Sequence, residues 1–535
     1  MNVIERAVAT LPGRLNRPPH EMKRRAPLGV IAIALLISTP GSLYAQIDVP
    51  TNRYDGGRSG VNLRETTLTA ANVNVKHFGK LYSYPVDGSV YAQPLYLANV
   101  MIAGAVHNVV YIATMKDKVY AFDADSASPS PLWMRDFTNP PSVTAIPITD
   151  IALEKNIWHE VGIEGTPVIN RNPDGTRTLY LVARTKESTP SGIKYVQRLH
   201  ALDISTGAER TSPVTITASV PGTAPDSTPA NGGQVIAFNA KMQQQRAGLA
   251  VTKGVVLIAW GSHEDLLPYH GWIMGYNAAT LAQVGVFAVS PDYGMGGIWQ
   301  GGRAPTLDAA GNAYFATGNA IWDGTRNYGD SLLKFKVSTS GLVLDNYFTP
   351  WDEHSLYLND DDLSGSGFTL LPESFTKVPN TELLFGGGKE GVLYLIDAKN
   401  LGKKVKDDTQ IVQKFATNGG HVMGGPVFWN SSAKGPRVYN WSEDDYLRAY
   451  EFTNGRVQEL TSAAGSVISP GHPGGPLTIT ANGSTAGTGI VWASIPTTGM
   501  PSTTSGRGFF APTTLTRSRR SGRASRTARA TALER

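Results

Sequence analysis

The chain has no cysteine among its 535 residues. It can therefore form no disulfide bond and no thiolate metal site, and it has no CxxCH motif for attaching a haem. Charged residues are also scarce, at 17%, whereas glycine is abundant, at 57 residues. This composition argues against a disordered or coiled-coil chain and is typical of many short strands joined by tight turns.

The N-terminal region has the pattern of a targeting segment. Lys23, Arg24 and Arg25 are followed by an apolar run over residues 28–37, which is too short to span a bilayer, and Ala45 offers a small residue for cleavage. We therefore expect a signal peptide over residues 1–45, export to the periplasm or the extracellular space, and no transmembrane segment after cleavage. An uncleaved N-terminal membrane anchor is the alternative.

The C-terminal tail is strongly basic, with eight arginines and one glutamate from Arg507 onward, which leaves the rest of the chain close to neutral. Read from the last base of each codon, the segment 508–514 can encode Ile-Leu-Arg-Ala-Tyr-Asp. This nearly repeats the sequence of residues 447–451. We therefore expect a frameshift near Met500, so that residues 499–535 form a disordered, out-of-frame tail, and we expect no nucleic-acid binding.

A pair of strands recurs along the chain. The alternation in residues 110–114 and 119–124 predicts two strands joined by a hairpin-length connection. The same pair recurs at 179–183 with 199–203, 256–260 with 273–277, 313–317 with 332–336, 383–387 with 393–397, and 438–442 with 447–451. A strand unit repeated at intervals of tens of residues indicates stacked or ringed repeats.

The flanking sequence extends each pair to four strands. Many units open on a segment such as 166–169, 304–307 or 425–428, with proline near a first strand, and close on a fourth strand such as 284–287. Four antiparallel strands per unit form a propeller blade. We predict an all-β propeller over residues 46–498, with seven to eight blades expected, six of them complete and a partial one starting at Gly475. Residues 79–86 would supply an outer strand to the last blade.

The repeat resembles that of a known family. Val119–Ala124 (Val-Tyr-Ala-Phe-Asp-Ala) and Leu202–Gly207 (Leu-Asp-Ile-Ser-Thr-Gly) are similar to the repeat of pyrroloquinoline quinone (PQQ) enzymes, the quinoprotein alcohol dehydrogenase-like propellers. Residues 53–73 resemble the segment that precedes the first blade in that family. The resemblance covers roughly residues 50–498 and implies an eight-bladed ring. It is specific for the fold but weak for activity, because one fold hosts many functions.

Function in propellers usually sits at the axis, where the loops that lead into the innermost strands converge. From four of these loops we expect Glu164, Arg246, Trp299, Arg303 and His421 to approach one axial mouth. Arginine suits carboxylates and tryptophan suits stacking, so the set fits a planar, anionic ligand. The alternative for each residue is ordinary turn chemistry in glycine-rich loops.

Two further segments are candidate metal sites. Asp361 and Asp362 could bind Ca²⁺, although they lack the alternating ligands of an EF-hand loop and also fit a solvated acidic turn. Residues 262–265 and 270–272 combine two histidines, two carboxylates and a tryptophan. They could form a metal or substrate site, or simply pack as a hairpin.

Two functions follow from these features. The first is a monomeric binding scaffold, with no recognisable catalytic residues, that takes an unknown small molecule or protein at the mouth. The second is a PQQ- and Ca²⁺-dependent dehydrogenase of an alcohol or a sugar. Enzymes of the family typically carry a vicinal cysteine pair over the quinone, which this chain lacks. The sequence therefore favours the scaffold.

Overall fold

The computed structural model describes residues 47–152, 157–230, 232–469 and 471–495. It also gives the backbone of three short strands near the chain ends, β1 (Asn2–Ala7), β37 (Phe509–Thr513) and β38 (Thr531–Ala532). Apart from these strands, the predicted signal peptide and the predicted tail lie outside the described residues. Within the described part, no helix has the length and apolar character needed to cross a membrane.

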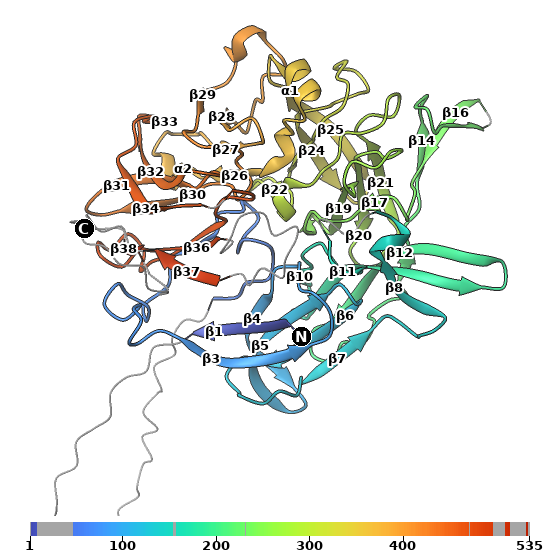
Figure 1. The fold of residues 1–535 in the computed structure, drawn as a ribbon, viewed down its shortest axis with the longest axis horizontal. Helices are drawn as coiled ribbons and strands as arrows, with labels where there is room; N and C mark the ends of the chain where they lie inside the picture. The colour runs from blue at the N-terminus through green and yellow to red at the C-terminus, as the bar shows by residue number, and fades with distance from the viewer. Residues whose placement is uncertain are drawn as a thin grey trace, which may run out of the picture.

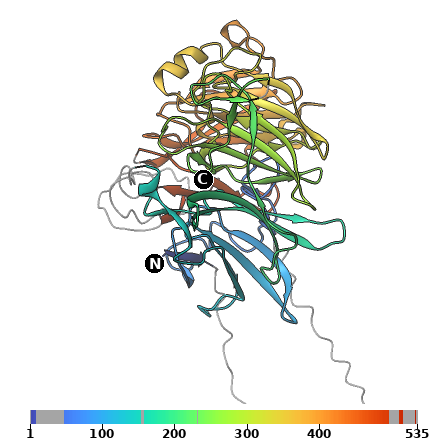
Figure 2. The ribbon, with the colours of Figure 1, turned by 90° about the vertical axis from the view of Figure 1, so that its right-hand side faces the viewer.

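Six sheets that each include four consecutive antiparallel strands follow one another along the chain, and a seventh sheet follows them. Figure 1 shows them arranged in a ring, from blue blade 1 through green and yellow to red blade 7, and Figure 2 shows the ring from the side. The sequence prediction of an all-β propeller with six complete blades and a seventh partial one is confirmed.

Each blade uses the strands that the repeat predicts. Blades 1 to 3 are β4 (Leu95–Ile102), β5 (Ala105–Thr114), β6 (Lys118–Asp123), β7 (Trp133–Asp136); β10 (Val168–Arg171), β11 (Arg177–Thr189), β12 (Gly192–Asp203), β13 (Val214–Thr215); and β18 (Ala250–Thr252), β19 (Val255–Ser262), β20 (Trp272–Asn277), β21 (Gln283–Ala288). Blades 4 and 5 are β22 (Thr306–Leu307), β23 (Ala313–Ala316), β24 (Leu332–Ser338), β25 (Gly341–Phe348); and β26 (Phe368–Leu371), β27 (Leu383–Gly387), β28 (Val392–Asp397), β29 (Gln413–Ala416).

The last two blades have additional strands beyond this plan. Blade 6 is β30 (Val427–Ser431), β31 (Gly435–Asn440), β32 (Tyr446–Thr453) and β33 (Arg456–Val457), with β34 (Ala463–Ile468) also on β32. Blade 7 is β35 (Leu477–Thr480), β36 (Ile490–Ile495) and β37, with β2 (Val61–Asn62) parallel to β35 and β38 on β36.

The remaining elements lie between or beside the blades. They are β3 (Lys80–Val86), β8 (Val143–Pro147), β9 (Glu160–Val161), β14 (Ser219–Pro221), β15 (Thr228–Ala230), β16 (Gly233–Ala237), β17 (Gln243–Gln244), α1 (Glu353–Asn359), α2 (Glu373–Thr376) and 3-10 turns at Ile148–Asp150, Gln300–Gly302, Leu363–Gly365 and Lys406–Asp408. The hairpin of β14 and β16 projects from the edge of the ring (Figure 1).

The core consists of the faces of neighbouring blades. Tyr111 and Val119 of blade 1 pack with Leu179 and Leu181 of blade 2, and every later blade meets its neighbour in the same way. A strand between two neighbours is buried on both faces, and all eight residues of β19 are buried. This is why the inner strands are continuous apolar runs rather than alternating ones.

The segment that precedes blade 1 in the sequence lies between blade 7 and blade 1. Val73 packs with Ile490 on the outer face of blade 7, and Tyr84 of β3 packs with Ile112 and Phe122 on the outer face of blade 1. Strand β3 thus packs on the outer face of blade 1, whereas the sequence predicted that it would supply an outer strand to the last blade. Its partner, however, is β1, and β35 to β37 form a separate sheet.

Residues 49–62, which we call the N-terminal arm, run along the innermost strands. Arm backbone pairs with the first strands of blades 1, 2, 4, 5 and 7, including N–H donation from Leu307 to Gly56 at 2.7 Å and from Ile479 to Gly60 at 2.8 Å. The buried Arg58 guanidinium donates to the carbonyl of Pro305 at 2.9 Å and to the Thr51 hydroxyl at 2.8 Å. The arm thereby ties together blades that are far apart in the sequence.

Candidate functional site

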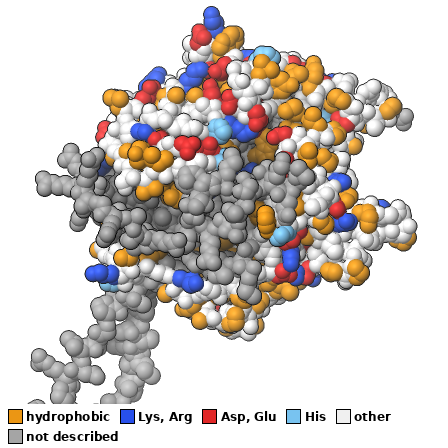
Figure 3. All heavy atoms as spheres, viewed as in Figure 1, with side chains coloured by type: hydrophobic (Ala, Val, Ile, Leu, Met, Phe, Trp, Pro, Cys, Tyr) orange, Lys and Arg blue, Asp and Glu red, His pale blue; other side chains and the backbone are white. Residues whose placement is uncertain are grey.

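The top face of the ring is the end at which two sets of loops meet. Lead-in loops run into the first strand of each blade, and middle turns join its second and third strands. The Lys389 N–H in the middle turn of blade 5 donates to the Asp362 carbonyl in a lead-in loop at 3.0 Å, and Glu443 N–H donates likewise to the His421 carbonyl at 3.1 Å. Figure 3 shows charged and histidine side chains close to the middle of one face of the ring.

The Trp299 indole lies over three glycines of the top face. A Cβ atom would come within 2.3 Å of the ring at Gly297, 2.7 Å at Gly261 and 2.6 Å at Gly318, so only glycine fits beneath it. Its Nε1–H donates to the Ser262 carbonyl at 3.1 Å, which fixes the rotation of the ring. Because the side chain is half-buried, part of the indole surface remains available to a ligand.

Asp362 lies next to this indole, since a Cβ on Gly318 would contact both groups. One carboxylate oxygen accepts the backbone N–H of Asn319 at 2.9 Å, and the other lies 2.5 Å from the Lys389 ammonium. Burial raises the pKa of Asp362 to about 6, although the pairing with Lys389 opposes the rise. A carboxyl group of this pKa can release and accept a proton near neutral pH.

Lys389 and Asn319 complete the surroundings of Asp362. Burial lowers the pKa of Lys389, but the Asp362 and Asp360 carboxylates raise it more, so its pKa lies above the ordinary value and the group stays charged. Asn319 donates from its side-chain amide to Asp360 at 2.8 Å. Its own buried Oδ1 has no hydrogen-bond partner among the described residues, which is costly unless a ligand supplies one.

Glu164 brings a second buried carboxylate to the top face. Its Oε1 accepts from Gln244 at 2.7 Å, and its buried Oε2 has no hydrogen-bond partner in the described part of the chain. Burial raises the pKa of Glu164, and the positive charges of Arg246 and Arg184 oppose this rise. Arg246 is half-buried, so part of its side chain remains accessible.

Arg184 links this carboxylate to His263. Burial lowers the pKa of Arg184 to about 10, and Glu164 and Asp117 act against the fall. Its Nη1 lies 2.9 Å from Nε2 of His263. Arginine can only donate, so Nε2 accepts and the proton lies on Nδ1, which is buried without a described partner. Burial, followed by the charge of Arg184, lowers the pKa of His263 well below its usual value.

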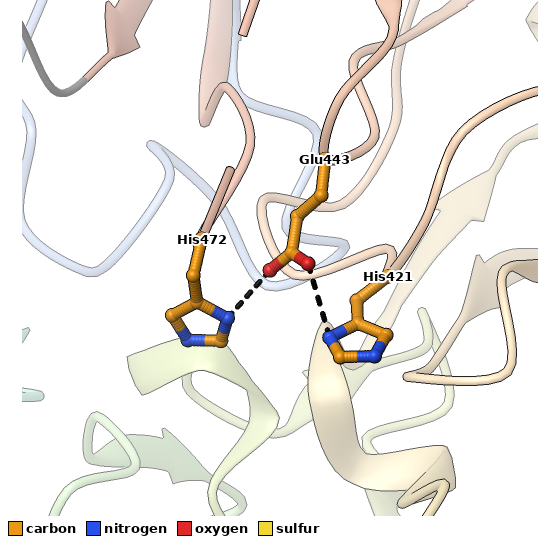
Figure 4. Close-up of side chains that lie close together, drawn as sticks. All are labelled: His421, Glu443 and His472. Atoms are coloured by element: carbon orange, nitrogen blue, oxygen red, sulfur yellow. Dashed lines mark ion pairs between the residues drawn. The ribbon is translucent and has the colours of Figure 1, made fainter. Parts of the chain in front are cut away.

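His421, Glu443 and His472 gather at one side of the top face (Figure 4). They come from the lead-in loop of blade 6, its middle turn and the lead-in loop of blade 7. The Glu443 carboxylate is 3.1 Å from Nδ1 of His421 and 2.5 Å from Nδ1 of His472.

The predicted site residues differ in their surroundings. Glu164, Arg246 and Trp299 lie with polar groups of the top face, as described above, and His421 belongs to the His–Glu–His group. Arg303 is buried and donates to the Arg58 carbonyl at 3.1 Å and to the Ser366 carbonyl at 3.2 Å. Its guanidinium is thereby engaged in holding the N-terminal arm to blade 5.

The two predicted Ca²⁺ ligands, Asp361 and Asp362, differ in how deeply they are buried. Asp362 is 4% exposed, so its carboxylate is buried beside Trp299. Asp361 is half-buried, and its strongest electrostatic partner is His421. Burial raises the pKa of Asp361.

The polar hairpin at residues 262–272 is largely packed. His270 is buried, with its Nε2 3.1 Å from Asp226, and Trp272 is fully buried in the core. Asp265 accepts from the Tyr269 hydroxyl at 2.9 Å. Of the two readings that the sequence left open, hairpin packing describes most of this segment, whereas His263 faces Arg184.

Four residues of the site escaped the sequence prediction: Arg184, Asn319, Lys389 and Glu443. Arg184 lies within an apolar strand, and the other three lie in middle turns. The blade repeat does contain a usable signal, because middle turns and lead-in loops share one end of a propeller. Polar residues that follow the second strand of each blade could therefore have been predicted as site residues on the same grounds as those in the lead-in loops.

No family model matches the sequence, and no curated protein matches it. Solved structures do. A quinohemoprotein alcohol dehydrogenase, ADHIIG, from Pseudomonas putida HK5 is 14% identical, with a TM-score of 0.47 over 84% of this chain and 69% of that chain. The enzyme of the same type from Comamonas testosteroni is 15% identical, with a TM-score of 0.40 over 84% of this chain and 77% of its own. A europium-containing methanol dehydrogenase is 11% identical, with a TM-score of 0.42 over 84% and 90%.

Proposed function

We propose that the mouth binds a planar, polyanionic quinone of the PQQ kind together with Ca²⁺, and that the protein thereby oxidises an alcohol or a sugar. The observation that carries this proposal is the Trp299 indole lying on glycines directly beside the buried Asp362 and its ion-pair partner Lys389. The repeat resemblance supports the choice of cofactor. The proposal rests on the chemistry of the residues present.

The polar groups around Trp299 fit such a ligand. An aromatic face suits a flat ring system, and the cations of Lys389 and Arg246 suit its carboxylates. Ca²⁺ prefers oxygen ligands, and the Oδ1 of Asn319 and Oε2 of Glu164 are buried oxygens without a described hydrogen-bond partner. A bound cofactor and its cation would satisfy groups that are otherwise costly to bury.

The cofactor, when bound, would supply the acceptor for the electrons of the substrate, which no side chain of this protein can provide. The chain's own residues would bind and orient it. Trp299 would set the plane of the ring, and Lys389 would stay charged beside it because two carboxylates raise its pKa. Burial would exclude water and so strengthen each electrostatic contact.

Asp362 is the residue that we assign as the base. Its pKa of about 6 leaves it mostly ionised at neutral pH and able to take the hydroxyl proton of a substrate. The Asn319 N–H holds one of its oxygens in place, and Lys389 stabilises the ionised form. The proton thus goes to a carboxylate oxygen that already has a fixed orientation.

A binding scaffold remains the second candidate, and the absence of cysteine favours it. A vicinal cysteine pair over the quinone is typical of active enzymes of the resembling family. A chain without this pair could bind the cofactor, or another planar anion, without turnover. The two candidates share the site and differ in whether Asp362 has a catalytic role.

Dye-linked oxidation separates the two candidates. The full chain, loaded with PQQ and Ca²⁺, would be offered a panel of primary alcohols and sugars with an artificial electron acceptor. We expect turnover that falls at least 100-fold in Asp362→Asn, while cofactor binding remains. Asp407→Asn, which removes an exposed carboxylate, is the matched control. Binding without turnover in the unmodified protein would favour the scaffold.

A further inference from the structure

We propose that His421, Glu443 and His472 bind one divalent transition-metal ion, with Zn²⁺ as the best match, and that its remaining coordination position is open to solvent on the top face. This site is separate from the Ca²⁺ ligands of the proposed function. It would bind its metal with or without a quinone.

The donor atoms converge without being hydrogen-bonded to one another. One ligand atom from each of the three side chains, an imidazole nitrogen or a carboxylate oxygen, lies within 4.8 Å of the other two. Yet Nδ1 of His421 and Oε1 of Glu443 are buried atoms with no hydrogen-bond partner among the described residues. Their contacts of 3.1 Å and 2.5 Å are ion-pair contacts when the imidazoles are protonated, yet they leave these close polar atoms without a hydrogen bond.

A metal ion resolves this conflict. Ligand atoms at the usual bond lengths of about 2.0–2.1 Å around a tetrahedral ion lie about 3.3 Å apart. Other histidine–carboxylate pairs in the chain behave differently. Nδ1 of His107 is hydrogen-bonded to Asp123 at 2.9 Å, and Nδ1 of His200 is hydrogen-bonded to Glu209 at 2.7 Å. Neither pair has a second imidazole.

Backbone hydrogen bonds hold two of the three ligands, His421 and Glu443, in position. The Glu443 N–H donates to the His421 carbonyl at 3.1 Å, and the Gly420 N–H donates to the Glu443 carbonyl at 2.9 Å. A Cβ on Gly420 would lie 3.4 Å from Glu443, so the loop packs closely over this side chain. The carboxylate is thus fixed between two neighbouring blades before any metal arrives.

Ligand type and exposure identify the kind of ion. Two imidazoles and one carboxylate suit Zn²⁺ and related transition metals, whereas Ca²⁺ and Mg²⁺ prefer oxygen ligands only. Glu443 is 9% exposed in its side chain, but His421 and His472 are 40% and 39% exposed. Three protein ligands with a solvent-facing side match the zinc sites that keep a position open for water or a substrate oxygen.

Metal binding to the untagged full chain tests this proposal without any quinone. After treatment with a chelator, the protein would be titrated with Zn²⁺ by calorimetry, and with Co²⁺ while its visible absorption is followed. We expect one Zn²⁺ per chain and intense Co²⁺ bands of low coordination number. Glu443→Gln and His472→Ala should each weaken binding at least 10-fold.

His107→Ala is the matched control, because it removes a histidine that pairs with a single carboxylate. It should bind Zn²⁺ as the unmodified chain does. Circular dichroism would verify that each variant folds, and Zn²⁺ should raise the melting temperature of the unmodified protein but not that of Glu443→Gln. Absence of saturable Zn²⁺ binding, or equal binding by Glu443→Gln, would overturn the proposal.

Discussion

The Asp362 carboxylate lies 2.5 Å from the Lys389 ammonium, and the two side chains come from the two different sets of loops that form the top face. Asp362 belongs to the lead-in loop of blade 5 and Lys389 to the middle turn of the same blade. The Asn319 N–H, from blade 4, also donates to Asp362. One buried carboxylate therefore joins two blades beside the Trp299 indole.

Asp362 should make the stability of the fold depend on pH. Its folded pKa of about 6 lies above the ordinary value of 3.8, so the native state binds more protons than the unfolded chain between these values. Protonation of Asp362 therefore contributes up to about 3 kcal/mol to the free energy of unfolding. This contribution is fully present below about pH 4 and is lost as the pH rises through 6.

Urea denaturation at a series of pH values checks this expectation. The difference in unfolding free energy between the unmodified chain and Asp362→Asn should fall as the pH rises from 4 to 7. Asp407→Asn, at an exposed carboxylate, controls for the loss of one charge. A difference that stays constant with pH would contradict the proposed environment of Asp362.

Gly297→Ala should disturb the indole without unfolding the ring. The new methyl group would begin 2.3 Å from the Trp299 ring, so the ring must move. We expect PQQ affinity to fall at least 10-fold, measured by quenching of tryptophan fluorescence. Gly79→Ala is the matched control, because a Cβ there meets nothing within 4 Å. Equal affinity in Gly297→Ala and Gly79→Ala would show that the indole does not form the ligand surface.

Arg58→Ala should destabilise the propeller by about 3 kcal/mol or more, because several carbonyl and hydroxyl groups would lose a charged donor inside the ring. Arg64→Ala, at an exposed position just beyond the N-terminal arm, should change stability by less than about 0.5 kcal/mol. Denaturant midpoints measure both. Similar midpoints for the two variants would mean that the arm does not hold the inner strands together.

The sequence predicted the blades well because each is a local unit. Strand alternation and spacing identify the inner pair of strands, and closely spaced strands pair as hairpins. The site was harder to predict, since its members meet only when the ring closes. Arg303 is an example. The sequence correctly placed it in a lead-in loop, but its side chain is buried and donates to backbone carbonyls. No local sequence pattern distinguishes an arginine with this structural role from one that binds a ligand.

The predicted frameshift affects residues 499–535, whose side chains lie outside the described part of the chain. If it is right, the coding DNA near the Met500 codon will contain an inserted or missing base, and the corrected frame will encode a strand after β36. Sequencing across that codon decides the matter. An unchanged reading frame would mean that residues 499–535 belong to the natural protein.

The most direct test of the proposed function is an equilibrium titration of the full chain with PQQ in the presence of Ca²⁺, followed by tryptophan fluorescence and by the absorption of the quinone. The proposal predicts saturable binding of one PQQ per chain, a dependence on Ca²⁺, and at least a 10-fold loss of affinity in both Gly297→Ala and Lys389→Met. Absence of saturable binding by the folded, unmodified protein, or binding unaffected by either substitution, would contradict it.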